Sequence, residues 1–261
     1  MSASRRSKTR SRISHQQSWI WGRHTVLEAI RSDRWTPCEV RFVEDLPREE
    51  FAELAQFCAE RDVESSVVSS DRLEQLVHHQ AHQGMIARMP EYTYLPANDL
   101  FQRRVSNALY LVLDSIQDAF NFGAALRSAE VLGVDAVLVG ERDQCGMTSQ
   151  AVRSSAGAVH HLPIHRSSDL TDALAKLQTR DIQVIAASEK GDRTIGECDL
   201  VRSTAIVLGN ENSGIAPERL ALCGIQARIP QTGRVGSLNV AVAAGIVLYE
   251  AIRQRTIPES D

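Results

Sequence analysis

The sequence predicts an α/β protein in two unequal parts, with a mostly parallel sheet in the larger part over residues 108–261. Strand-like and helix-like runs alternate at close spacing there, which is typical of a parallel sheet covered by helices on both faces. A smaller α/β unit over 19–89 precedes it. The stretch between them, 90–107, contains Pro90 and Pro96 and is predicted to be a linker that lets the leading unit move.

The leading unit is predicted from its periodicity. Phe51, Leu54, Phe57 and Cys58 follow helical spacing, whereas the shorter apolar runs are rich in β-branched residues. In chain order we expect a helix capped by Thr25 and running to Ile30, a strand over 40–43, a helix over 49–61, a strand over 63–68, a helix capped by Asp71, and a strand over 83–89.

The larger part is predicted in the same way, after one short helical turn near Leu100 in the linker. Its expected strands lie at 109–113, 136–139, 159–164, 182–187, 205–208 and 226–229, and its expected helices at 123–132, 169–178, 217–222 and 237–255. The last helix is rich in small residues, which suits either a buried core helix or a subunit interface.

Composition excludes several classes of protein. The chain has 261 residues, of which 43% are apolar and 24% charged, as in ordinary globular proteins. No apolar run approaches the roughly 20 residues that a bilayer span needs, and the N-terminus lacks the apolar segment of a secretory signal. Five cysteines occur without a Cys-x-x-Cys pair, which suits reduced thiols in the cytoplasm.

Charge is unevenly distributed along the chain. Residues 1–18 carry five basic side chains and no acid, so the net charge of −4 combines a tail of +5 with a remainder of −9. We expect a disordered basic tail that contacts phosphates nonspecifically, or else a solubilising extension without a partner. Any RNA site on the acidic body must depend on local basic clusters.

Common nucleotide and metal motifs are absent from the sequence. It contains no Gly-x-Gly triplet, no Gly-Lys-Ser/Thr and no His-Glu-x-x-His. Histidines cluster at 78–82 and 160–165, but no second pair of ligands is spaced to complete a metal site. We therefore expect no metal.

The segment 229–245 is the most informative part of the chain; it reads IPQTGRVGSLNVAVAAG. Uncharged polar residues and glycines lie where a strand end turns into a long helix of small residues. Such a loop offers many backbone donors and little charge, which favours a small-molecule site.

Three segments together resemble the SpoU class of RNA ribose 2′-O-methyltransferases, in the SPOUT superfamily. They are 113–129 (LDSIQDAFNFGAALRSA), 206–215 (IVLGNENSGI) and 229–245, in the family's order and spacing. The resemblance implies a trefoil-knotted SPOUT domain, S-adenosyl-L-methionine as the cofactor, and a homodimer. One departure is Ala119-Phe120, where the family often has Asp-Pro before the motif Asn.

The resemblance also implies which residues bind the cofactor. An adenine needs backbone donors and acceptors within an apolar slot, and glycines permit close backbone approach. The matching positions are Leu208, Gly209, Ile229, Gly233 and Leu238, with Ser188 after the 182–187 strand as a further candidate. The alternative interpretation of Ile229 and Leu238 is that they are ordinary core residues.

The catalytic residues implied by the resemblance are Asn121, Arg127, Glu211, Ser237 and Asn239. Arg127 would clamp an RNA phosphate; the family offers it also as the base for the 2′-hydroxyl, a role that a permanently protonated guanidinium fits poorly. Glu211 would orient Asn121 or Arg127, or accept a hydrogen bond from the ribose. The alternatives are an exposed Arg, a turn at Glu211, and helix capping by Ser237 or Asn239.

The leading unit, with its His82-Gln83-Gly84 sequence, resembles the L30e-like RNA-binding domain that precedes the catalytic domain in bacterial 23S rRNA guanosine-2′-O-methyltransferases. We expect Arg23, His24 and Arg127 to contact RNA. The function that this implies is 2′-O-methylation of a guanosine in 23S rRNA. The alternatives are a tRNA ribose methyltransferase, which often lacks such a leading domain, and a non-catalytic RNA-binding assembly factor.

Overall fold

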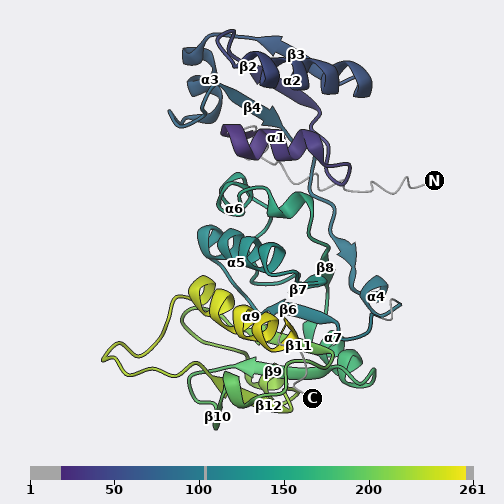
Figure 1. Cartoon of the computed structure of the whole chain (residues 1–261), viewed down its shortest axis with the longest axis vertical. Helices are drawn as coiled ribbons and strands as arrows, with labels where there is room; N and C mark the ends of the chain where they lie inside the picture. Colours follow the sequence, from purple (N-terminus) through teal and green to yellow (C-terminus); the bar gives the residue numbers. More distant parts are fainter. Residues whose placement is uncertain (1–18, 103–104, 257–261) are drawn as a thin grey trace, which may run out of the picture.

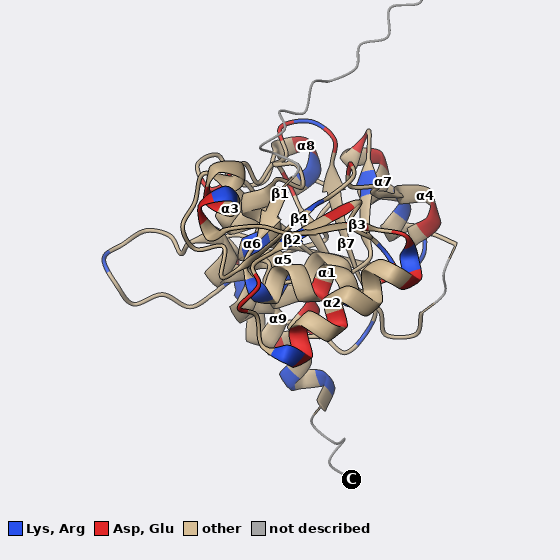
Figure 2. Ribbon diagram, turned by 90° about the horizontal axis from the view of Figure 1, so that it is seen from above, with Lys and Arg blue, Asp and Glu red and all other residues tan. Residues whose placement is uncertain are grey.

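The computed structural model describes residues 19–102 and 105–256, so the predicted basic tail over 1–18 lies outside the described residues. Figure 1 shows a small α/β domain stacked on one end of a larger α/β domain. Figure 2 shows acidic and basic positions interspersed over the described helices of both domains.

The small domain has a mixed four-stranded sheet in the order β1-β4-β2-β3, with three helices. Its elements are β1 (Trp19–Trp21), α1 (Arg23–Arg31), β2 (Glu39–Phe42), α2 (Arg48–Arg61), β3 (Glu64–Val67), α3 (Ser70–Val77) and β4 (Met85–Arg88). The prediction missed β1, a strand of three residues that is buried along its whole length.

Both helix caps predicted in this domain are wrong. Helix α1 begins at Arg23 because Gly22, at φ 97°, turns the chain three residues before the predicted cap; Thr25 lies inside the first turn and is buried. Helix α3 is capped by Ser69, whose side chain accepts a hydrogen bond from the Arg72 amide at 3.3 Å. Asp71 lies in the first turn of that helix, where an acid also suits the helix dipole.

The large domain has an eight-stranded sheet in which every neighbouring pair is parallel, as the strand–helix alternation predicted. The strand order is β10-β12-β9-β11-β6-β7-β8-β5. The strands are β5 (Leu95–Pro96), β6 (Leu109–Leu113), β7 (Ala136–Gly140), β8 (Ile164–Ser167), β9 (Gln183–Ala187), β10 (Arg193–Thr194), β11 (Thr204–Leu208) and β12 (Ile225–Arg228).

Helices cover both faces of this sheet because the central strands alternate buried side chains between two cores. On β6, Leu109, Leu111 and Leu113 belong to the core shared with α5 (Ala119–Val131) and α9 (Val240–Thr256). Tyr110 and Val112 face the other core, with α7 (Leu170–Gln178) and residues around α4 (Ala97–Leu100) and α8 (Pro217–Leu220).

The strand predicted over 159–164 is wrong. Gly157, at φ 95°, turns the chain into the 3-10 helix η2 (Ala158–His160), and β8 begins only at Ile164. Val159 and Leu162 are buried there against the core rather than in a sheet. A short helix that the periodicity did not predict, α6 (Ser149–Ser154), precedes this turn; a second 3-10 turn, η3 (Ile195–Glu197), lies farther along the chain.

The described part of the predicted linker, 90–102 and 105–107, contains regular structure. The predicted turn near Leu100 is present as α4, and β5 pairs in parallel with β8 at the edge of the large sheet. One continuous core runs from Val26 and Trp35 of the small domain into the large domain. The mobility that the sequence predicts for the leading domain stays a prediction.

The end of α9 is fixed to the rest of the domain chiefly by the side chain of Arg255, and the Gln254 Oε1 also accepts from the Leu200 amide at 2.9 Å. The Arg255 guanidinium donates to the carbonyl oxygens of Leu200 at 2.8 Å, Arg202 at 3.0 Å and Ala108 at 3.3 Å, and also to that of Asn107. The C-terminal helix is therefore held against the amino ends of β6 and β11. The trefoil knot that the resemblance implies stays a prediction.

None of the described helices is long and apolar enough to cross a membrane. Within residues 19–102 and 105–256, no group of three or more His, Cys, Asp or Glu side chains is arranged to hold a metal ion. The five cysteines are free thiols, three of them buried.

Candidate functional site

A cavity of about 480 Å³ lies at the carboxyl ends of β9, β11 and β12. Three chain segments supply most of its lining, namely 187–190 at the end of β9, 208–215 at the end of β11, and residues between Ile229 and Ala243 that lead into α9. Ligands of open parallel sheets bind at this edge, where the chain leaves one strand for the next helix. The size is in the range of small-molecule sites.

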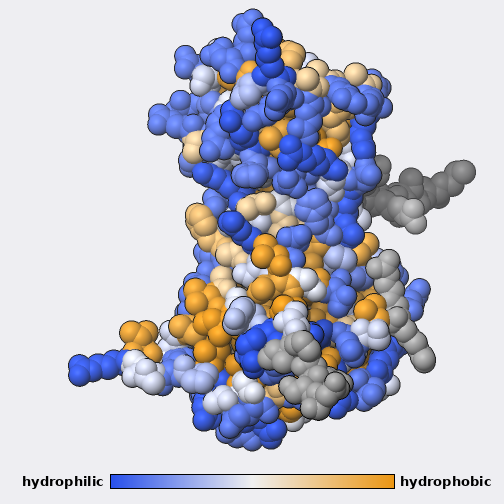
Figure 3. Space-filling view, in the orientation of Figure 1, coloured by the Kyte–Doolittle hydropathy of each residue, from blue (hydrophilic) through white to orange (hydrophobic). Residues whose placement is uncertain are grey.

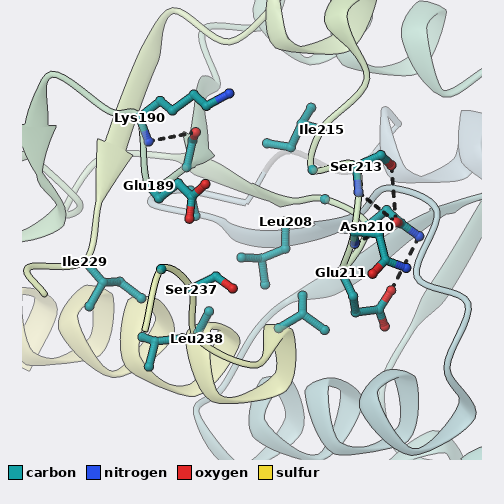
Figure 4. A pocket seen from close by; sticks show the side chains of 18 of the residues that line it. Glu189, Lys190, Leu208, Asn210, Glu211, Ser213, Ile215, Ile229, Ser237 and Leu238 are labelled. Atoms are coloured by element: carbon teal, nitrogen blue, oxygen red, sulfur yellow. Dashed lines mark hydrogen bonds between the residues drawn. The ribbon is translucent and has the colours of Figure 1, made fainter. Parts of the chain in front are cut away.

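The apolar part of the cavity contains the three residues predicted for the adenine slot. Figure 4 shows Leu208 in the middle of the cavity, with Ile229 and Leu238 on the side of α9. Leu208 is 2% exposed and also belongs to the core, whereas Leu238 is 40% exposed. The alternative that Leu238 is an ordinary core residue is therefore wrong.

The two glycines predicted to allow close backbone approach differ. A Cβ on Gly209 would lie 2.2 Å from the Gly214 carbonyl carbon and the Ile215 nitrogen, so only glycine fits beside the returning loop. A Cβ on Gly233 would meet no protein atom within 4 Å, and Gly233 does not line the cavity. Gly233 lies in the loop between β12 and α9, which projects from the domain in Figure 1, and its predicted role in cofactor binding stays a prediction.

Ser188 lies in the loop after β9 and lines the cavity, as predicted. Its side chain accepts a hydrogen bond from the Lys190 amide at 3.3 Å, and its own amide donates to the Ala227 carbonyl at 2.8 Å. Sequence reasoning missed Glu189 and Lys190, whose charged side chains border the same end of the cavity (Figure 4). The signal available was their position directly after a parallel strand.

A chain of hydrogen bonds joins three of the predicted catalytic residues. The Asn239 Nδ2 donates to Asn121 Oδ1 at 2.8 Å, and the Asn121 Nδ2 donates to Glu211 Oε1 at 3.0 Å. These residues come from the start of α9, the first turn of α5 and the loop after β11. Glu211 therefore orients Asn121, which was one of the roles left open from the sequence.

Asn210 holds the loop that carries Glu211, a role that the sequence pattern did not indicate. Its Oδ1 accepts from the amides of Asn212 at 2.9 Å and Ser213 at 3.1 Å, and its Nδ2 donates to the Ser115 carbonyl at 2.7 Å. Ser213 thus lies in a turn and does not cap a helix. The Asn210 Nδ2 is also 3.4 Å from Glu211 Oε2.

A buried ion pair anchors the far end of the same loop. Asp114 is 1% exposed, and its Oδ2 accepts from the Ala216 amide at 3.0 Å and from Arg219 Nε at 2.9 Å. Its Oδ1 accepts from the Ser115 hydroxyl at 2.9 Å. One carboxylate therefore ties the end of β6 to the segment that closes the cavity.

The two polar residues before α9 have different roles. Asn239 Oδ1 accepts from the amides of Ala241 at 2.9 Å and Val242 at 3.3 Å, so the capping interpretation is confirmed for this residue. Its Nδ2 is the group that binds Asn121. Ser237 lies two residues earlier, lines the cavity and does not cap the helix.

The structure does not bring Arg127 to this cavity. Arg127 is exposed on α5 and lines a second cavity of about 310 Å³ between the two domains, together with His24, Glu28 and His161. Two of the residues predicted to contact RNA, Arg127 and His24, thus share one cavity. The third, Arg23, forms an ion pair with Glu50 at 3.0 Å.

The first cavity fits S-adenosylmethionine in its chemistry. It offers an apolar slot, a backbone loop that only glycine permits at Gly209, and charged groups of both signs at Glu189 and Lys190. The polar network of Asn121, Glu211 and Asn239 lies at the opposite side, where an acceptor hydroxyl would approach. This arrangement can hold a small charged cofactor and orient a second substrate.

Comparison with known proteins agrees with this geometry. Residues 108–249 match the model of the SpoU rRNA methylase family, and residues 19–95 match that of the RNA 2′-O ribose methyltransferase substrate-binding domain. A 23S rRNA (guanosine-2′-O-)-methyltransferase RlmB of Xylella fastidiosa is 32% identical, with 94% of this chain and 100% of that protein covered.

Solved structures show the same similarity. A crystal structure of an RNA 2′-O ribose methyltransferase is 30% identical, with a TM-score of 0.76, and the match covers 96% of this chain and 93% of that one. An AdoMet-bound rRNA methyltransferase from Sinorhizobium meliloti has a TM-score of 0.80 at 24% identity, covering 93% and 89% of the two chains. The chain therefore belongs to the SpoU rRNA methylase family and is an S-adenosylmethionine-dependent RNA ribose 2′-O-methyltransferase.

Proposed function

We propose that the enzyme methylates the ribose 2′-oxygen of one guanosine in 23S rRNA and works with the ribosome in the cytoplasm. The observation that carries this is the leading domain, matched as a substrate-binding domain and packed beside the catalytic domain. A relative with the same two parts is named for that reaction. The intact Asn239–Asn121–Glu211 chain argues against a non-catalytic assembly factor.

The cofactor supplies a methyl group already activated on a sulfonium, so the protein's task is mainly to position the acceptor. We assign cofactor binding to Ser188, Leu208, Gly209, Ile229 and Leu238, and keep Gly233 as a loop position without an assigned contact. The Asn121 Oδ1 and Nδ2 atoms each form one hydrogen bond within the protein. One N–H donor and one acceptor position of this amide therefore remain for the ribose. Glu211 has further lone pairs that accept a hydrogen bond from the 2′-hydroxyl, and Ser237 borders the same space.

RNA binding is assigned to the side of the molecule where the two domains meet. His24 on α1 and Arg127 on α5 line one cavity, and Arg23 lies beside His24. An Arg offers a planar fork that binds phosphate oxygens in pairs. RNA held by the small domain would therefore pass Arg127 on its way to the first turn of α5, where Asn121 lies.

The substrate is tested by methylation assays with unmodified RNA. Purified enzyme and S-adenosylmethionine carrying a labelled methyl group are incubated with 23S rRNA, 16S rRNA and a tRNA pool. We expect label at one guanosine 2′-oxygen of 23S rRNA, located by resistance to alkaline cleavage. Faster labelling of tRNA would favour the tRNA alternative, and RNA binding without any labelling would favour the assembly factor.

We further propose that the enzyme is a homodimer joined through α9. Val242, Ile246 and Tyr249 are exposed and repeat at helical spacing on one side of that helix. Figure 3 shows apolar side chains gathered on the face of the large domain where Figure 1 places α9 and α5. Val235, in the projecting loop, is also exposed. A second copy would cover this surface, and SpoU-class sites are completed across a two-fold interface.

Replacing Tyr249 with Glu should therefore give monomers, because it places a charge in the centre of an apolar interface. Tyr249 is 61% exposed, and Val67→Glu is the matched control, since Val67 is 51% exposed on the edge strand β3 of the small domain. Sedimentation velocity should show a dimer for the wild type and Val67→Glu and a monomer with strongly reduced methyl transfer for Tyr249→Glu. A monomeric, fully active wild type would contradict the proposal.

A further inference from the structure

The contact between the two domains is built around His160, in η2 of the large domain. The Ser32 hydroxyl at the end of α1 donates to the His160 carbonyl oxygen at 2.7 Å. The Trp35 ring stacks on the His160 imidazole, with ring centroids 5.4 Å apart and an interplanar angle of 25°. Both rings are buried, so this contact lies in the interior of the molecule.

His160 acts here as a neutral ring. It is 1% exposed, and no described residue forms a hydrogen bond with either ring nitrogen. Burial, with a smaller effect from His161, lowers the pKa of His160 to about 4. The Trp35 indole nitrogen donates to the Pro90 carbonyl at 3.1 Å, and Tyr92 packs edge-on against Trp35 at 4.9 Å. The start of the stretch 90–107 is thereby held in the same contact.

The fit is closest at Gly157, directly before η2. A Cβ at this position would lie 2.6 Å from Glu28 Cγ and 2.8 Å from Glu28 Cβ, closer than side-chain atoms approach one another. Glu28 belongs to α1 of the small domain and forms an ion pair with His161 of the large domain at 2.8 Å. The absence of a side chain at Gly157 therefore sets how near α1 can lie.

A second contact holds the domains together along the other edge. The Arg153 guanidinium of α6 lies over the Trp21 ring at 5.6 Å and is 3.4 Å from the His79 ring. Helix α6 also packs on α5 through Gly123, where a Cβ would lie 2.2 Å from the Ala151 carbonyl oxygen. Contacts therefore lead from the small domain through α6 and η2 to α5, which carries Asn121.

We propose that this interface is a positioning device that holds the RNA-recognition domain at a fixed offset from the methyl-transfer cavity and so selects which nucleotide is methylated. Glu28, Gly157 and His160 are the positioning residues. The inference rests on the proposed function, because it requires that the small domain binds the RNA. RNA bound to the small domain then places one ribose at Asn121. If the small domain lay at a different distance from the cavity, a different ribose, or none, would reach Asn121.

The test is a variant that forces the domains apart. Gly157→Ala adds a Cβ against Glu28. Gly133→Ala is the control, because Gly133 also has a positive φ, 67° against 95° at Gly157, but its Cβ would meet no atom within 4 Å. We expect Gly157→Ala to lower kcat on full-length 23S rRNA by roughly 10- to 100-fold, since a displacement of about 1 Å can have this effect. Label at other nucleotides should rise relative to the target guanosine.

The affinity for the cofactor should stay within a few-fold in both variants, because neither Gly157 nor Gly133 lines the first cavity. Glu28→Ala serves as a second variant: it removes the ion pair with His161 without a steric conflict and should lower site selectivity in the same direction, to a smaller extent. If Gly157→Ala and Glu28→Ala matched Gly133→Ala in rate and in site selectivity, the inference would be overturned while the proposed function stood. A wild-type enzyme that left 23S rRNA unlabelled would overturn both.

Discussion

Replacing Arg127 with Ala is expected to lower methyl transfer by about three orders of magnitude or more while leaving cofactor affinity within a few-fold. The two results separate because Arg127 lines the cavity between the domains and not the one that fits S-adenosylmethionine. A desolvated charge-assisted contact to RNA and the positioning that it provides are each worth about 2–4 kcal/mol. Single-turnover methylation of 23S rRNA and calorimetry with the cofactor measure the two effects.

Arg127→Lys distinguishes between two roles of this side chain. A lysine restores the charge but not the planar fork, so it should rescue poorly if Arg127 grips a phosphate through paired hydrogen bonds. Near-full rescue would favour simple neutralisation of the phosphate charge. Arg202→Ala is a suitable control, because Arg202 pairs with Asp181 near the amino ends of β9 and β11, away from both cavities. Near-full activity of Arg127→Ala itself would show that the catalytic assignment is wrong.

The elements that could be predicted from the sequence are those whose residues are all buried in the same way, within the sheet. Strand β6 has the predicted bounds because all five of its residues are buried, as a central parallel strand requires. The error at 159–164 has the opposite cause. Val159 and Leu162 are as apolar as strand residues, but Gly157 turns the chain and the small domain packs on it, and neither effect has a local signature.

The same division applies to the site. Asn121, Glu211 and Asn239 could be named because their segments resemble known motifs, but the direct hydrogen bonds between them follow only from the fold. Asn210 and Asp114 could not be identified, since an Asn or Asp after a strand is typical of turns and caps. Arg127 was predicted as a catalytic residue together with Asn121, and its position six residues along α5 brings it to the cavity between the domains.

Replacing Asp114 with Asn is expected to weaken cofactor binding and to destabilise the protein. The buried carboxylate accepts three hydrogen bonds, including that of Arg219, and breaking such a pair from one side costs about 3–5 kcal/mol. Asp114 does not line the cavity, but it anchors the 208–215 segment that does. We expect the free energy of unfolding to fall by that amount and the cofactor Kd to rise by about tenfold or more.

A surface acid provides the comparison for Asp114. Asp172→Asn removes the exposed partner of Lys176 on α7 and should change the free energy of unfolding by about 0.5 kcal/mol or less. Urea unfolding and calorimetry at a temperature where every variant is folded separate stability from affinity. If Asp114→Asn lost stability but bound the cofactor as tightly as the wild type, the ion pair would support the fold alone. A parallel loss of stability and cofactor affinity would show that an ordered 208–215 segment is needed for the cavity to bind the cofactor, because the variant leaves every lining residue in place.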